Sequence, residues 1–289
     1  MKKGLFLCAA LLTGLLSMPG NTAAQEEASP DEAPAQDQTY DRGCIRLNFW
    51  SANYTGDIKI EAEDVFGGTN IIKGDRLNLK DEYGLNNPQT VPEIEGWIRL
   101  GEKHRLIFSY FFAHYEGEEK LETNVDVGGL TFGGSTDLET EFTFSRILLM
   151  HQWNPIMNDR GRLGLMWGSE YYMWTIGYEG FDVIGGIESD SDSLPIFIPV
   201  LGIDGELDLA YGFGLYGSLV GAGIDMGFVE ASYTDFNLGA YYEYKRLRAA
   251  LGFRTIDTSL VSDPDKDEDE ALDIKFSHNG VLLSVGVYF

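Results

Sequence analysis

The sequence predicts an all-β fold: a closed antiparallel barrel of about ten strands that crosses a membrane. Apolar and polar residues alternate along several stretches after residue 42. Many of these stretches run past about ten residues, which is long for strands of globular domains but suits a tilted strand that spans a bilayer. The links between them tend to be short and long in turn, and the chain opens on a secretion signal.

Residues 1–24 are predicted to be a cleaved signal peptide. A positive start, an apolar run over residues 4–18 and small residues up to Ala24 have the order of a secretion signal. The apolar run is short for a spanning helix, which needs about 20 residues. Residues 25–41 are acidic and rich in Pro and Ala, so we expect a disordered lead segment there. The barrel is assigned to residues 42–289.

Charge and composition narrow the function. The net charge is −25, and loss of Lys2 and Lys3 with the signal lowers it to −27. Such a chain is not expected to bind nucleic acid, because phosphates require a basic surface. Aromatic residues make up 13% of the chain, which favours an ordered protein over a disordered acidic one. Cys44 is the only cysteine after the signal, so no internal disulfide is expected.

The candidate strands follow one another from residue 43 to the end of the chain. Eight or twelve strands remain alternatives to ten, because "TNIIKGDRLNL" at 69–79 is strand-like and a further hairpin could lie in the link 58–92. The ten stretches are 43–57, 93–101, 104–116, 138–152, 161–178, 195–208, 213–226, 228–243, 247–259 and 271–289.

The lengths of the links indicate two different ends of a barrel. The links at 101–103 and 244–246 are tight turns, whereas 117–137 and 261–271 are long. Barrels of the bacterial outer membrane have short turns on the periplasmic side and longer loops outside. The link at 225–227 breaks the pattern, since it is short where a long one is due.

Alternation separates a lipid face from a lumen face. In 247–254, Leu251 and Phe253 oppose Arg248 and Arg254. Lipid offers no partner to backbone polar groups, so only a closed sheet satisfies them all. Aromatic residues expected in the interface girdles are Trp50, Tyr110, Trp153, Trp167, Tyr171, Tyr242 and Phe289.

The same alternation predicts a cluster of charges in the lumen. A barrel of about ten strands is narrow enough for side chains to fill, so its buried charges must pair. We expect the arginines to bridge carboxylates; a thin, cation-preferring water path is the alternative, because acids outnumber bases. The predicted lumen charges are Glu95, Arg99, Glu170, Asp204, Glu206, Asp208, Asp235, Glu243, Arg248 and Arg254.

The terminal "SVGVYF", together with "EKHRLIFSYFF" at 102–112 and the signal, resembles bacterial outer-membrane β-barrel proteins of the small, porin-like or OmpA-like kind. The resemblance implies export to the outer membrane, contact with its lipid and both termini toward the periplasm. It also implies that the barrel-assembly machinery reads a C-terminal signal. Here that signal would comprise Gly286, Val287, Tyr288 and Phe289.

No motif of enzyme chemistry accompanies this pattern. The four histidines, His104, His114, His151 and His278, stand outside any GxSxG, HExxH or CxxC motif. We therefore predict a protein that is not an enzyme, without catalytic residues, cofactor or specific metal site. The acidic stretch "DPDKDED" at 263–269 lacks the ligand spacing of a calcium loop and would attract divalent cations only diffusely.

The expected function is that of a non-enzymatic outer-membrane barrel, either structural or a narrow porin-like channel with acidic extracellular loops. The alternative is a surface hydrolase acting on lipid or peptide. It would require His114 or His278 beside a carboxylate or serine at the outer rim. A soluble secreted β-sandwich is the third hypothesis, because alternation alone also suits a sheet with one solvated face.

Overall fold

A computed structural model gives the fold of the chain. It describes residues 42–63, 71–72, 77–78, 89–120, 125–127, 130–132, 137–181, 187–225, 229–262 and 271–289. In these ranges we find no helix with the length and hydrophobicity that crossing a membrane demands. The predicted signal peptide, the lead segment and the acidic stretch 263–269 lie outside the described residues.

Ten long strands make up the described part of the chain, and four short strands accompany them. The long strands are β1 (Gly43–Glu63), β4 (Gln89–Gly101), β5 (His104–Lys120), β8 (Asp137–Asn158), β9 (Gly161–Phe181), β10 (Ile187–Asp208), β11 (Phe213–Asp225), β12 (Val229–Tyr244), β13 (Leu247–Ser262) and β14 (Ala271–Tyr288). The short strands are β2 (Ile71–Ile72), β3 (Leu77–Asn78), β6 (Val125–Val127) and β7 (Leu130–Phe132).

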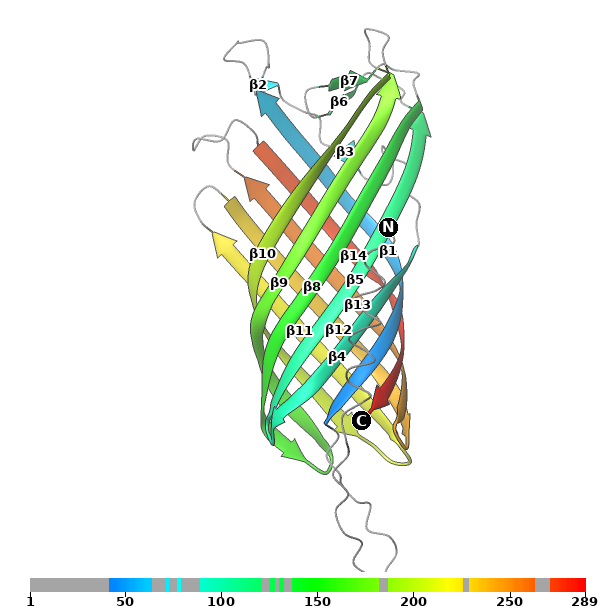
Figure 1. Cartoon of the computed structure of the whole chain (residues 1–289), viewed down its shortest axis with the longest axis vertical. Helices are drawn as coiled ribbons and strands as arrows, with labels where there is room; N and C mark the ends of the chain where they lie inside the picture. Colours follow the sequence, from blue (N-terminus) through cyan, green and yellow to red (C-terminus); the bar gives the residue numbers. More distant parts are fainter. Residues whose placement is uncertain are drawn as a thin grey trace, which may run out of the picture. The chain divides into compact units, whose positions relative to one another are not determined.

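The long strands close into an antiparallel barrel (Figure 1). Each pairs with its neighbours in the chain, and β14 returns to β1 in register from Cys44↔Tyr288 to Glu61↔Ala271. Where the strands pair all the way round, closure leaves no free sheet edge; toward the outer end, β10 extends beyond its pairing with β11, which runs from Leu201 to Asp208. The predicted barrel of ten strands is confirmed, and the sandwich hypothesis is wrong. In the link 58–92, the described strands β2 and β3 pair only with β1 and add no further strand to the barrel wall.

An apolar belt surrounds the barrel next to the short turns. On β14, Val281, Leu283, Val285 and Val287 point outward and are 48–54% exposed. Further up the same face the outward residues turn polar, as at Lys275, which is exposed. Only a hydrocarbon environment suits a continuous apolar ring of this kind.

The belt covers only part of each strand. On β9 the outward apolar face runs from Leu163 to Met173 and continues with Thr175 and Glu179. Eleven residues of a strand tilted by roughly 40° rise about 25 Å, which is the height of the apolar band of membrane barrels. The strands therefore continue well beyond the lipid on the side opposite the short turns.

The aromatic girdle prediction needs one correction. Trp153, Trp167, Tyr171, Tyr242 and Phe289 are exposed on the outer face, and Tyr110 points outward and is half-buried. Trp50, however, is 1% exposed and lies inside the barrel. On β1 the outward positions are Leu47 and Phe49, so the period of two places residue 50 inside whatever its type.

Candidate functional site

The lumen contains two groups of ion pairs beneath a layer of aromatic side chains. The first group, here called the upper charge cluster, is a ring of alternating charges. The guanidinium of Arg146 contacts Glu93 at 2.9 Å and Asp235 at 2.9 Å. Arg254 contacts the same two carboxylates, Glu93 at 2.7 Å and Asp235 at 2.6 Å. All four residues are buried, so each charge depends on its neighbours in the ring.

The ring joins opposite walls of the barrel. Glu93 and Arg146 come from β4 and β8, whereas Asp235 and Arg254 come from β12 and β13, which lie on the far side of the strand order. Glu170 adds a third carboxylate, 3.5 Å from Arg146, and accepts a hydrogen bond from the Tyr172 hydroxyl. The ring thus cross-links segments that are distant in the sequence.

The second group, the lower charge cluster, lies nearer the short turns. Arg162 pairs with Asp204 and, at 3.1 Å, with Glu206. Arg248 contacts Glu206 at 2.8 Å and Glu243 at 3.0 Å. Two further contacts complete this group: Arg46 pairs with Glu95, and the Tyr241 hydroxyl donates to Asp208.

The predicted lumen charges all lie on the inward face of their strands. Arg248 and Arg254 bridge carboxylates, whereas Arg99 lines the opening at the short-turn end. Sequence reasoning missed Arg146, because the inward residues beside it, Phe144 and Leu148, are as apolar as the outward ones. It also missed Glu93, which lies two residues before Glu95 and therefore on the same inward face of the strand. The missed lumen charges are Arg46, Glu93, Arg105, Arg146 and Arg162.

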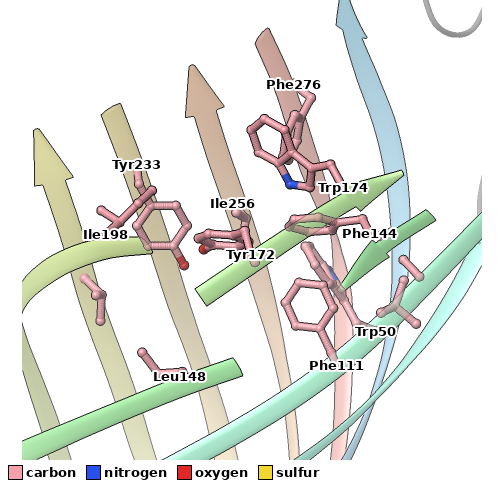
Figure 2. Close-up of a cluster of buried hydrophobic side chains, with 14 of the residues drawn as sticks. Trp50, Phe111, Phe144, Leu148, Tyr172, Trp174, Ile198, Tyr233, Ile256 and Phe276 are labelled. Carbon is pink, nitrogen blue, oxygen red and sulfur yellow. The ribbon is translucent and has the colours of Figure 1, made fainter. Parts of the chain in front are cut away.

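An aromatic layer crosses the lumen above the upper charge cluster. Figure 2 shows several of its side chains, among them Trp50, Phe144 and Trp174. Its rings are in direct contact: the centroids of Phe144 and Tyr172 are 5.4 Å apart, and those of Tyr54 and Tyr115 are 5.1 Å apart. A side chain that lines a water-filled pore exposes one face to water, whereas the side chains of this layer are buried. The layer, here called the aromatic plug, consists of Trp50, Tyr54, Phe111, Tyr115, Phe142, Phe144, Tyr172, Trp174, Tyr233 and Phe276, each at most 3% exposed.

Described residues line two small cavities in the barrel interior. One, of about 90 Å³, lies between the two charge clusters and is lined by residues of both, among them Arg146 and Glu206. The other, of about 190 Å³, lies at the short-turn end. Arg162, Glu206 and Trp97 border both cavities, so the lower charge cluster stands between them.

The histidines divide between the two faces. His278 lies within the aromatic plug, 4.7 Å from the ring of Tyr54, and neither of its ring nitrogens has a hydrogen-bond partner among the described residues. His114 is on the outer face above the belt; its Nε2 lies 2.9 Å from Glu116 Oε1 and its Nδ1 lies 3.3 Å from Thr143 Oγ1. His114 therefore meets the geometric condition for the hydrolase hypothesis, and His278 does not.

The remaining two histidines lie next to each other on the outer face near the short turns. The rings of His104 and His151 are 5.2 Å apart, and His151 lies 4.4 Å from the ring of Trp167. Within the described ranges, no group of three or more His, Cys, Asp or Glu is arranged to hold a metal ion. The histidines outside the plug are thus surface residues of the girdle and the outer rim.

The C-terminal residues close the barrel. Gly286, Val287 and Tyr288 pair with Arg46, Ile45 and Cys44 of β1. The backbone N–H of Phe289 donates to the carbonyl of Gly43 at 3.0 Å. The C-terminal strand therefore completes the seam of the barrel with β1.

Closure, the outer apolar belt and the charged interior together define an outer-membrane β-barrel protein. No protein-family model matches the chain, and no curated protein matches its sequence. Among solved structures, the chain is similar to the outer membrane protease OmpT from Escherichia coli, with 13% identity, a TM-score of 0.53 and coverage of 85% of this chain and 97% of that one.

Two further structures are similar at lower scores. The transport unit of the autotransporter AIDA-I from Escherichia coli has 10% identity, a TM-score of 0.43 and coverage of 90% of this chain and 93% of that one. Ail, the attachment invasion locus protein of Yersinia pestis, has 10% identity, a TM-score of 0.27 and coverage of 86% and 99%. At these identities the similarity concerns the fold alone.

Proposed function

We propose that this protein is a non-conducting, non-enzymatic barrel that serves as a rigid membrane anchor for the segments at its outer end. The observation that carries the proposal is the aromatic plug, whose side chains have almost no surface in contact with water. Below it, the upper charge cluster ties the walls together with four contacts of 2.6 to 2.9 Å. Of the expected structural and channel functions, this geometry favours the structural one.

The position of the plug relative to the belt supports the same function. Trp50 directly follows Phe49, the last large apolar residue on the outer face of β1, so the plug lies near the outer lipid boundary. Above it, β8 and β9 continue with exposed Glu139 and Glu179. A solid core at that level would stiffen the strands that rise beyond the membrane.

Planar-bilayer recording of the refolded protein tests the proposal. The wild-type barrel is expected to insert without discrete conductance steps at any applied voltage. A variant with Phe144, Arg146 and Trp174 all replaced by Ala removes plug and ring contacts together and provides the positive control. The matched control is Trp167→Ala, which removes an exposed tryptophan from the opposite face of β9. Discrete steps from the wild-type protein would refute the proposal.

A surface hydrolase is the second candidate, and it rests on His114. Its imidazole has the Glu116 carboxylate at one nitrogen and the Thr143 hydroxyl at the other, with Glu141 at 3.5 Å from the second nitrogen, and a carboxylate and a hydroxyl on opposite nitrogens are the connections of a nucleophile–base–orienter set. The group lies on the outside of the barrel near exposed Phe112, where a lipid would be the accessible substrate. Release of fatty acid from detergent-dispersed phospholipid, abolished in His114→Ala but kept in His104→Ala, would favour this candidate over the anchor.

A further inference from the structure

Arg105 is a buried guanidinium that is not in direct contact with any described carboxylate. Its side chain points into the lumen from the second residue of β5, close to a short turn, and is 8% exposed. The central carbon of the guanidinium lies 3.9 Å from the centroid of the Trp97 ring. Among the described residues it forms no hydrogen bond or direct ion pair, although the carboxylates of Glu206 and Asp204 lie close enough to act on its charge. A buried charge without a direct contact is costly, so the residue stands out beside Arg162 and Arg248, which are both in contact with carboxylates.

Three other arginines lie near Arg105, at the same cavity. Its partner in register on β4 is Arg99, and two like charges directly opposite each other destabilise a strand pair. Arg162 and Arg248 border the same cavity, but both are held by carboxylates of the lower charge cluster. Arg105 therefore remains available to a group from outside the barrel wall.

The cavity in front of Arg105 has the size and walls of a small-ligand site. It occupies about 190 Å³ at the short-turn end and is lined by Trp97, Met157 and Tyr288 in addition to the charged residues. A cavity of roughly 150 Å³ is enough for a benzene-sized molecule. Aromatic walls with one fixed charged group are the usual composition of a site that orients a small amphiphilic ligand.

We propose that this cavity binds a small oxyanion, a monocarboxylate or phosphate, anchored on Arg105. The planar guanidinium matches the two oxygens of a carboxylate or phosphate, and stacking on Trp97 fixes its plane. Glu206, Asp208 and Glu243 also border the cavity and offset three of its four arginines, so the remaining positive charge suits a ligand with one or two negative charges. The size of the cavity limits the ligand to the dimensions of benzoate or inorganic phosphate.

Isothermal titration of the full barrel in detergent with sodium benzoate and with sodium phosphate tests the proposal. Benzamide, the neutral analogue of benzoate, is the matched probe. We expect saturable binding of at least one oxyanion and none of benzamide. Arg105→Gln should weaken binding by about tenfold or more, because it removes charged hydrogen bonds. Arg160→Gln, at an exposed turn position of the same end, should leave the affinity within about twofold.

The outcomes separate the site from its alternatives. Failure of both oxyanions to bind wild-type protein, equal binding of benzamide, or unchanged affinity in Arg105→Gln overturns the proposal. Heat-modifiable migration in gels verifies that each variant is folded; should Arg105→Gln fail this check, Arg99→Gln, which borders the same cavity, takes its place and is expected to weaken binding. Binding in a cavity below the plug requires no conduction, so the bilayer recordings and this titration can fail independently.

Discussion

Replacement of Arg146 by Met should destabilise the barrel strongly. The side chain is 1% exposed and holds both Glu93 and Asp235 at 2.9 Å. Removing one partner of a buried ion pair costs about 3 to 5 kcal/mol, because the remaining charges are left without compensation. Water has almost no access to this side chain, so solvent does not screen the charges. Methionine fills a similar volume, so loss of packing contributes little.

The structure also predicts how the loss can be recovered. In Arg146→Met, Glu93, Asp235 and the nearby Glu170 face Arg254 alone. Adding Asp235→Asn removes one of the uncompensated negative charges, with Arg254 and Glu93 still paired at 2.7 Å. The two substitutions together should therefore cost less than the sum of their separate effects, by about 0.5 to 3 kcal/mol.

Urea unfolding in phospholipid vesicles, followed by tryptophan fluorescence, measures these free energies. The control is Lys275→Met, since Lys275 is exposed and lies 3.5 Å from Asp273, and such surface pairs contribute about 0 to 1 kcal/mol. A loss in Arg146→Met no larger than that in Lys275→Met, or strict additivity in the double variant, would refute the assignment of a coupled ring.

Three further predictions follow from the belt, the plug and the seam. Val285→Arg, at the middle of the belt, should lower the free energy of unfolding by about 2 to 4 kcal/mol, whereas Ser277→Arg above the belt should change it little; urea titration distinguishes the two. His278→Phe should be neutral or stabilising in the same assay, because it replaces an unpartnered buried ring with an apolar one, and a loss above about 2 kcal/mol would reveal a hidden hydrogen bond. Cys44, buried and free beside the seam, should resist a water-soluble maleimide in the folded barrel and react after unfolding in urea; rapid labelling of the folded protein would contradict its placement.

Sequence alternation predicted the barrel best where the two faces differ in polarity. Along β13 and β14, apolar outward residues such as Leu251 and Val285 oppose Arg248 and Ser284, and the inward face could be read from the residue types. Along β8 the inward face carries Phe142 and is as apolar as the outward one, so the period gave no polarity signal there. For this reason the aromatic plug could not be predicted from the sequence.

The partners of the lumen charges were beyond sequence reasoning. Glu93 and Arg254 are 161 residues apart, and only the closure and shear of the barrel bring them within hydrogen-bond distance. Strand ends were also underestimated on the side beyond the lipid. The predicted strand 195–208 begins at Ile187 in the structure. Its first residues include several Asp and Ser, because a strand wall outside the membrane has no need for an apolar outer face.

The most direct test of the account is to measure which molecules contact the methyl groups on the outward and the inward face of the barrel. Nuclear Overhauser spectra of the methyl-labelled barrel in lipid nanodiscs should show contacts from Val281, Leu283 and Val285 to acyl chains. Leu282 and Ile256, at most 2% exposed, should contact aromatic protons and neither lipid nor water. Water contacts at Leu282 or Ile256 would mean that the interior is an open, wet passage and would contradict the closed, filled barrel described above.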